Sequence, residues 1–210
     1  MTDKQVLTVF IIDDDDDIRS SLSRALSKRG YAVEVFASAR QFLDRYEPNK
    51  LGCIILDYGM PDMNGLQLQR YMNENAIALP IIFITGHGGI PESVAAIKQG
   101  AIDFLEKPFR QATLVNCIET AFGTLLETQR FQQSHKQLAE NVARLTKRER
   151  EVAEFIVLNP SMTSSKDVGR HLGISPRTVD HHRARVLEKM SMSSVTELVD
   201  QCVKAGVFSR

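Results

Sequence analysis

Five short apolar runs, separated by amphipathic stretches, organise residues 1–122. Each run has the length and the unbroken hydrophobicity of a strand that is buried on both faces. The predicted strands are residues 7–12, 32–36, 53–56, 81–84 and 102–105. Helical periodicity fills the gaps at about 18–29, 39–46, 66–73, 91–99 and from 111 onward. Parallel strands need helical crossovers, so the alternation predicts an α/β fold with a doubly wound, five-stranded parallel sheet.

Polar residues follow four of these predicted strands. Aspartates 13–17 follow the first strand, Asp57 the third and Thr85 the fourth, and Lys107 stands just after the fifth. The carboxyl ends of parallel strands share one edge of a sheet, where the ligands of open α/β sheets bind. The sequence therefore predicts one pocket with several carboxylates, a hydroxyl group and an ammonium group.

Clustered carboxylates at a sheet edge suit Mg²⁺, a hard cation that retains several waters. We expect Asp14 and Asp57 to bind the ion directly and Asp13 to bind it through water. The Gly59 carbonyl is expected to complete the shell. The Asp57 carboxylate would then attack phosphorus as a nucleophile and form an acyl phosphate.

Neighbouring residues indicate which kind of phosphoryl transfer the pocket supports. Lys107 and the Thr85 hydroxyl would hold the remaining phosphoryl oxygens by charge-assisted hydrogen bonds. A haloacid-dehalogenase-type phosphatase also uses an aspartate nucleophile with Mg²⁺, but it requires a second acid two residues later. That position is Gly59, which excludes this enzyme class. Aspartates 15–17 are expected to cap and compensate the next helix.

Four motifs occur in order along residues 6–122, namely IIDDD, LDYGMPDMNG, ITGHGGIP and FLEKPF. Together they resemble the receiver domain of two-component response regulators, and TGHG with Pro91 resembles the FixJ-type subgroup. The resemblance implies that Asp57 takes a phosphoryl group from the histidine of a sensor kinase. It also implies that Phe104 is an aromatic switch residue that follows the movement of Thr85. His87 is expected to be a surface loop residue without chemistry.

Residues 123–143 are predicted to form a helical linker, because the sequence there is polar and lacks proline. An apolar 4-3-4-3 spacing, typical of a coiled-coil seam, runs through Phe131, His135, Leu138, Val142 and Leu145. Two interpretations remain open. The helix forms a coiled coil with a second copy of the chain, with Leu138 and Val142 at the interface, or it packs on its own domain.

From Thr146 onward the pattern is entirely helical. Capping signals appear at Thr146 with Glu149, at Ser164 with Asp167 and at Ser175-Pro176, and a last helix covers about 195–205. Two helices joined through Gly173 have helix-turn-helix proportions. The second helix carries polar and cationic residues suited to the major groove and its phosphates, namely Arg177, Thr178, His181, Arg183 and Arg185.

Residues 144–207 resemble the LuxR/NarL-type four-helix DNA-binding domain. The resemblance is carried by the segments LTKREREV and SSKDVGRHLGISPRTVDHHRARVLEKM. This resemblance implies phosphate contacts from Lys166 and from the start of the recognition helix. It implies base contacts near Asp180, His181 and Ala184, although many members carry Lys at the position of Asp180. His182 fits a position that the family keeps inside the helix packing. Dimerisation is implied through the last helix, at Val195, Leu198, Val199 and Cys202.

The composition of the chain indicates its possible ligands and its cellular compartment. The chain has 26 acidic and 26 basic residues; residues 1–125 hold 16 and 12, so residues 126–210 hold 10 and 14. A basic C-terminal half is compatible with nucleic acid. The three separated cysteines are expected to be buried free thiols in a reducing cytoplasm. No apolar run approaches the roughly 20 residues of a membrane span, so we expect a soluble cytoplasmic protein.

These observations predict a receiver domain at 1–122, the helical linker at 123–143 and an all-α helix-turn-helix domain at 144–210. The predicted function is a phosphorylation-controlled transcription factor that is not an enzyme beyond its own Mg²⁺-dependent phosphorylation and slow dephosphorylation. Its expected partners are a sensor histidine kinase, double-stranded promoter DNA, RNA polymerase and a second copy of itself. The alternative is a phosphorelay or protein-binding regulator that acts without DNA contact.

Overall fold

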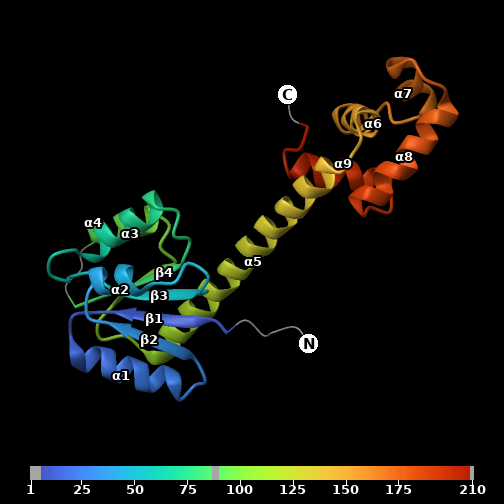
Figure 1. Ribbon diagram of the computed structural model, residues 1–210. Coiled ribbons are helices and arrows are strands. Elements are labelled where there is room, and N and C mark those ends of the chain that lie inside the picture. Colours follow the sequence, from blue (N-terminus) through green and yellow to red (C-terminus); the bar gives the residue numbers. More distant parts are fainter. Residues whose placement is uncertain (1–5, 87–89, 209–210) are drawn as a thin grey trace. The chain divides into compact units, whose positions relative to one another are not determined.

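The computed structural model describes residues 6–86 and 90–208, so His87 lies outside the described residues. The chain divides into two compact units, Met1–Thr128 and Gln129–Arg210 (Figure 1). The first unit combines strands and helices, and the described part of the second is helical. This division confirms the predicted fold class, an α/β unit followed by an all-α unit.

The first unit holds a five-stranded parallel sheet in the order β2-β1-β3-β4-β5. Its strands are β1 (Thr8–Ile12), β2 (Ala32–Phe36), β3 (Gly52–Asp57), β4 (Ile81–Thr85) and β5 (Asp103–Glu106). The connecting helices are α1 (Asp16–Ser27), α2 (Ala39–Arg45), α3 (Gly65–Glu74) and α4 (Ile90–Lys98). The strand order reverses between β1 and β3, which is the topological switch point where ligands of such sheets bind.

Both faces of the sheet are buried, which explains why the strands read as continuous apolar runs. One face packs Phe10, Ile54 and Phe83 against α2 and α3 through Phe42 and Leu68. The other face packs its alternate residues against α1 and α5, a helix described below. On this face the sheet contributes Val9, Ile11, Ile55 and Ile82, and the helices contribute Leu26, Leu114 and Ile118.

Two glycines permit close backbone approaches in this unit. A Cβ on Gly52 would lie 1.8 Å from the carbonyl oxygen of Thr8, on the neighbouring strand. A Cβ on Gly65, the first residue of α3, would lie 2.7 Å from the carbonyl oxygen of Asp57. Only glycine therefore lets α3 begin directly against the end of β3.

The helix α5 (Gln111–Ala143) begins in the first unit and ends in the second. It is followed by α6 (Lys147–Leu158), α7 (Ser165–Leu172), α8 (Pro176–Met190) and α9 (Val195–Lys204). The predicted caps are confirmed: Thr146 and Glu149 form a capping box, and Ser164 and Ser175 each accept a backbone N–H. Gly173 ends α7 with φ 66°, a left-handed conformation that suits glycine.

The second unit has its own core, and the end of α5 is part of it. Leu138 and Val142 are 6% and 7% exposed and pack with Val152, Ile156 and Val186. This burial corrects the expectation that Leu138 and Val142 line an intermolecular seam, and it favours the alternative in which the helix packs on its own domain. The apolar spacing correctly predicts which face of α5 is buried, but that face packs on the second unit and not on a second copy of the chain.

The same core corrects part of the predicted dimer contact on α9. Leu198 and Cys202 are both 0% exposed and pack inside the second unit, so they are not surface residues. Val195 and Val199 are half-buried. Val203, also on α9, is an exposed hydrophobic residue and is 59% exposed.

All three cysteines are free and buried, as predicted from their apolar surroundings. Burial raises the pKa of the Cys53 thiol, and it raises the pKa of Cys202 to about 11. Burial, together with a hydrogen bond to Asp103, also raises the pKa of Cys117 to about 11. Since the thiolate is the reactive form, these cysteines are structural.

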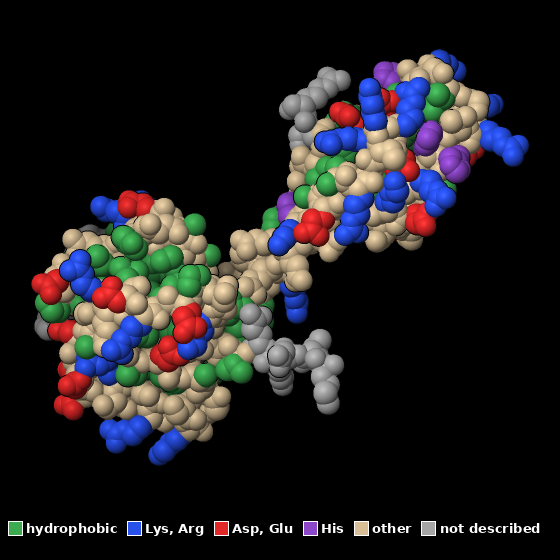
Figure 2. All heavy atoms as spheres, in the orientation of Figure 1, with side chains coloured by type: hydrophobic (Ala, Val, Ile, Leu, Met, Phe, Trp, Pro, Cys, Tyr) green, Lys and Arg blue, Asp and Glu red, His purple; other side chains and the backbone are tan. Residues whose placement is uncertain are grey.

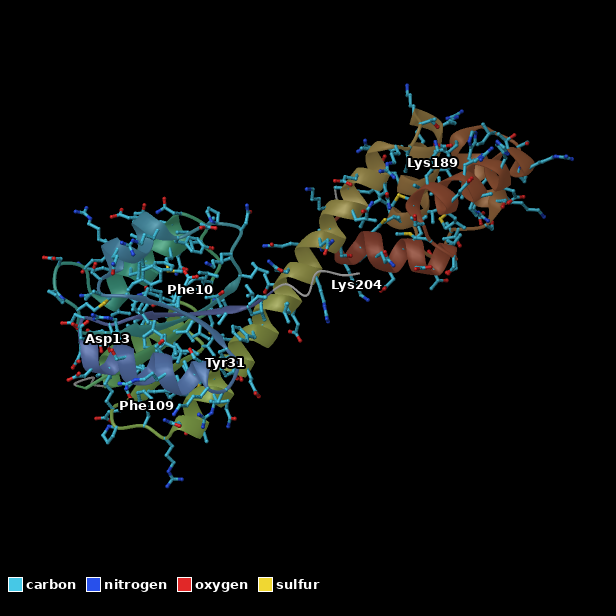
Figure 3. The ribbon with its side chains drawn as sticks, turned by 60° about the horizontal axis from the view of Figure 1, so that its bottom comes forward. Phe10, Asp13, Tyr31, Phe109, Lys189 and Lys204 are labelled. Carbon is cyan, nitrogen blue, oxygen red and sulfur yellow. The ribbon has the colours of Figure 1, made fainter. Side chains whose placement is uncertain are left out.

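An ion pair joins α6 to α8 within the second unit. Lys189 Nζ donates to Glu149 Oε2 at 2.6 Å, and the Thr146 backbone N–H donates to the same carboxylate oxygen at 2.8 Å. The Lys189 hydrogen bond outweighs the burial of Glu149, which is 6% exposed, and with the Thr146 contacts it lowers the pKa of Glu149 to about 2. Lys189 lies in the helical unit in Figure 3.

This ion pair predicts an acid-sensitive second unit. Because the folded pKa of Glu149 is about 2 and its ordinary value is 4.5, its stabilisation is present above pH 4.5 and is lost as the pH falls toward 2. Glu149→Gln should cost about 1–3 kcal/mol at pH 7 and flatten this decline. Urea unfolding followed by far-UV circular dichroism from pH 7 to pH 2.5 measures both effects. Glu188→Gln, on an exposed acid of α8, is the control; equal behaviour of the two variants would contradict the prediction.

Within the part of the chain that the structure describes, no helix is both long and apolar enough to cross a membrane.

Candidate functional site

The side chains predicted to share a pocket do meet at the carboxyl edge of the sheet. Asp13 follows β1, Asp57 ends β3, Thr85 ends β4 and Lys107 follows β5. Lys107 Nζ lies 2.8 Å from Asp13 Oδ2 and 2.7 Å from Asp57 Oδ1, so the ammonium group bridges the two carboxylates. Asp13, Asp57 and Thr85 are 1%, 7% and 3% exposed. Figure 3 shows Asp13 at the opposite end of the sheet from Tyr31.

A pocket of about 280 Å³ opens onto this cluster. It is lined by Asp13, Asp14, Asp15, Ile18, Asp57, Gly59, Thr85, Gly86 and Lys107. Asp14 is exposed at the rim, and the Gly59 backbone N–H donates to Asp57 Oδ2 at 2.7 Å. A larger groove, about 750 Å³, lies in the second unit between α6 and α7, and Phe155, Leu158 and Met162 contribute to its lining. The smaller pocket holds the converging carboxylates and the ammonium group, so it is the candidate site for phosphoryl chemistry.

Burial and charge pairing set the protonation of the cluster. Burial raises the pKa of Asp13 and outweighs the opposing hydrogen bonds from Lys107 and from the Asp15 backbone N–H. Burial alone would lower the pKa of Lys107, but its hydrogen bonds to Asp13 and Asp57 outweigh this and raise it. The ammonium group is therefore firmly protonated at neutral pH, and it holds an oxygen of each carboxylate in the pocket.

The donor set fits a hard cation. Asp13, Asp14 and Asp57 carboxylates and the Gly59 backbone line one pocket, and Mg²⁺ uses one or two carboxylates together with waters and phosphate oxygens. Within residues 6–86 and 90–208, no three His, Cys, Asp or Glu side chains are grouped as a metal site.

Phe104 lies on β5, three residues before Lys107, and its ring contacts two other aromatic rings. Its centroid is 5.8 Å from that of Phe83 in a stacked arrangement and 6.2 Å from that of Tyr58 in an edge arrangement. Tyr58 directly follows Asp57, so it connects the predicted switch residue to the pocket. Sequence reasoning did not identify Tyr58, although the sequence places it directly after Asp57.

Arg19 was also missed. It is 9% exposed, its Nη1 donates to the Asp13 carbonyl oxygen at 2.5 Å, and its other terminal nitrogen contacts the Asp16 carboxylate. The guanidinium group therefore fixes the loop that presents Asp13. The predicted capping role is confirmed for Asp15, whose carboxylate accepts the backbone N–H groups of Asp17 and Ile18.

A second candidate surface lies on α7 and α8. The exposed residues among those predicted to contact DNA are Lys166, Arg177, Asp180, His181, Ala184 and Arg185. Arg185 pairs with Glu188 at 2.9 Å, and the Thr178 hydroxyl lies 2.7 Å from that of Ser175. Figure 2 shows Lys, Arg and His side chains gathered over this part of the helical unit. An exposed helix with such a face has the geometry and charge for a nucleic-acid groove.

Arg183 differs from its neighbours on α8. Its side chain is only 20% exposed, and its Nη2 donates to the Thr163 carbonyl oxygen at 2.5 Å. This contact, inside the turn between α6 and α7, corrects the expectation that Arg183 is a freely available phosphate contact. His182 is half-buried, as its predicted place in the helix packing requires.

Comparison with known proteins assigns both parts of the chain to recognised families. The chain matches the response regulator receiver domain at residues 9–119 and the bacterial regulatory proteins of the luxR family at residues 143–202. It is 40% identical to the transcriptional regulatory protein FixJ of Azorhizobium caulinodans, over 96% of this chain and 94% of that protein. It is 39% identical to the response regulator protein TodT of Pseudomonas putida, over 91% of this chain and 83% of that protein.

Solved structures agree with this. The structure of the response regulator StyR is similar with a TM-score of 0.81 and 36% identity, and the match covers 95% of this chain and 99% of that one. A full-length FixJ structure from B. japonicum is similar with a TM-score of 0.59 and 37% identity, over 95% and 97% of the two chains.

Proposed function

Because this chain belongs to the two-component response regulators that join a receiver domain to a LuxR-type DNA-binding domain, we propose that Asp57 is its phosphoacceptor. Members of this family are transcription regulators, not metabolic enzymes, and a receiver domain implies a sensor kinase as partner. One observation carries the proposal: Lys107 bridges Asp13 and Asp57 in a pocket at the ends of β1, β3 and β5.

In the proposed transfer, an Asp57 carboxylate oxygen attacks the phosphorus of a phosphohistidine. The new P–O bond forms as the P–N bond breaks, and the histidine nitrogen leaves with the electron pair and takes up a proton. Lys107 then exchanges its contact with the Asp57 carboxylate for a phosphoryl oxygen, which is a charge-assisted hydrogen bond. The Thr85 hydroxyl holds another phosphoryl oxygen.

Receiver domains generally use Mg²⁺ for this reaction, and in this chain we propose that Asp14 and Asp57 would hold it directly. Asp13 would act through water and Gly59 through its carbonyl. The ion would neutralise charge on the phosphoryl oxygens.

The acyl phosphate carries about −1.5 to −2 charges in place of the single negative charge of the Asp57 carboxylate, and its phosphoryl oxygens lie beside Lys107 and Thr85. In the proposed switch, Thr85 moves toward the phosphoryl group and the Phe104 ring turns into the space that it leaves. Close-packed interiors change between discrete arrangements, so the surface of α4 and β5 changes with them. Two activated receivers then pair through that surface.

Pairing of the receivers is proposed to bring two DNA-binding units together on half-sites of promoter DNA. Val195 and Val199 on α9 are the retained candidates for contact between these units. We further propose that the protein acts in the cytoplasm and works with RNA polymerase at the promoter. Its relationship to the transcriptional regulatory protein FixJ supports this part of the proposal.

A selection experiment tests this function. Full-length chain treated with Mg²⁺ and acetyl phosphate, or with beryllofluoride as a phosphoryl mimic, is incubated with random double-stranded DNA. We expect the activated chain to enrich a motif and to show a higher dimer fraction in analytical ultracentrifugation. Absence of enrichment would favour the protein-binding alternative, and an unchanged mass would contradict the dimerisation step.

The salt dependence of binding tests the cationic surface. Lys166→Ala and Arg177→Ala should each weaken binding to every sequence and reduce the slope of log affinity against log salt by about 0.9. Fluorescence anisotropy at several salt concentrations measures this slope. Arg130→Ala, on an exposed residue of α5 outside α7 and α8, is the charge-matched control, and slopes that match it would place the phosphate contacts elsewhere.

A further inference from the structure

A chain of polar contacts joins three segments of the DNA-binding unit. Arg183 Nη2 donates to the Thr163 carbonyl oxygen, in the turn before α7, at 2.5 Å. Its Nη1 lies 3.8 Å from Asp180 Oδ1, one helical turn earlier on α8. The hydroxyl of Ser165, the first residue of α7, donates to the same Asp180 oxygen. The Asp180 side chain is 62% exposed and that of Arg183 is 20% exposed, so a largely buried arginine restrains an exposed carboxylate.

These contacts distinguish Arg183 and Asp180 from the neighbouring residues of α8. The Arg183 guanidinium group is committed to a backbone carbonyl and a carboxylate, whereas Arg177 and Arg185 are exposed. Asp180 uses one oxygen for both internal contacts and keeps the rest of its carboxylate at the surface of the recognition helix. A polar group fixed before binding discriminates between ligands better than a mobile one.

The chemistry of a fixed carboxylate selects one base. An ionised carboxylate only accepts hydrogen bonds. In the major groove, guanine presents N7 and O6 acceptors and thymine an O4 acceptor, and both repel it. Adenine places its N6 donor beside the N7 acceptor, while cytosine presents its N4 donor without an adjacent acceptor. We therefore propose that Asp180 is a specificity-determining residue for cytosine and that Arg183, with Ser165, is a positioning residue that holds it.

The inference rests on the proposed DNA binding, and one selection separates the two. Full-length wild-type and Asp180→Asn chains, both activated with beryllofluoride, are selected on random double-stranded DNA. Wild type should require cytosine at one position of each half-site, by roughly tenfold over other bases. Asp180→Asn should change that preference to adenine, because an amide pairs bidentately with N6 and N7. An unchanged motif in the variant would overturn the inference, whereas no motif for wild type would overturn DNA binding itself.

The substitution Arg183→Met tests whether Arg183 positions the Asp180 carboxylate. We expect it to reduce the cytosine preference by roughly tenfold while the salt slope stays at the wild-type value. Arg183→Lys, which keeps a donor for the Thr163 carbonyl, should restore part of the preference. Arg130→Met, on an exposed residue of α5 outside α7 and α8, should keep the full preference. If Arg183→Met lowers the salt slope and leaves the selected motif unchanged, Arg183 is a phosphate contact and its assignment as a positioning residue is wrong. If Arg183→Met does not fold, the motif selected by Asp180→Asn still tests the role of Asp180.

Discussion

Asp57→Asn should remove phosphorylation of this chain by acetyl phosphate in the presence of Mg²⁺. An amide is a poor nucleophile and cannot provide the anionic oxygen that the metal shell and the transfer both need. The substitution keeps the shape of a residue that is only 7% exposed, so the fold should survive it. Because the product is an acyl phosphate, the wild-type label should be stable to acid and labile to base, and the variant should show no label.

A matched control lies in the loop that follows Asp57. Asp62 is exposed and has φ 64°, a left-handed conformation that asparagine adopts readily. Asp62→Asn makes the same chemical change outside the pocket and should be labelled like wild type. A label that persists in Asp57→Asn would place the acceptor on another residue, and Asp13 or Asp14 would be the next candidates.

The pocket could be predicted from the sequence because strand ends carry positional information. Apolar runs that end at Asp13, Asp57 and Thr85 must bring these residues to one edge once the strands are parallel. Cap signals are local in the same way, so the start of α6 at Thr146 and the end of α7 at Gly173 were predictable.

Contacts between distant segments were not predictable. Arg183 and Arg185 are the same residue type on one helix, yet only Arg183 faces the turn whose Thr163 carbonyl it binds. Arg19 is likewise distinguished by the Asp13 carbonyl and not by any spacing. The seam through Leu138 and Val142 shows the same limit, because periodicity identifies an apolar face but not the surface that covers it.

The burial of this face changes what charged substitutions there should do. Leu138→Asp with Val142→Asp places two charges in the core of the second unit, next to Val152, Ile156 and Val186. Burying unpaired charge is among the few single-site changes that cost about 4 kcal/mol or more, and whole domains are stable by only about 5–15 kcal/mol. We therefore expect the second unit to unfold and DNA binding to be lost even in the monomer.

The first unit should be unaffected, since its core contains neither residue. The double variant should still be labelled at Asp57, while its helical signal in far-UV circular dichroism falls and its DNA binding disappears. Phe131→Asp separates the two interpretations of the helix, because this residue belongs to the same apolar spacing but is 59% exposed. It should leave the second unit folded, and it should lower the dimer fraction only if α5 also contacts a second copy. A double variant that stays folded but no longer dimerises would restore the coiled-coil interpretation.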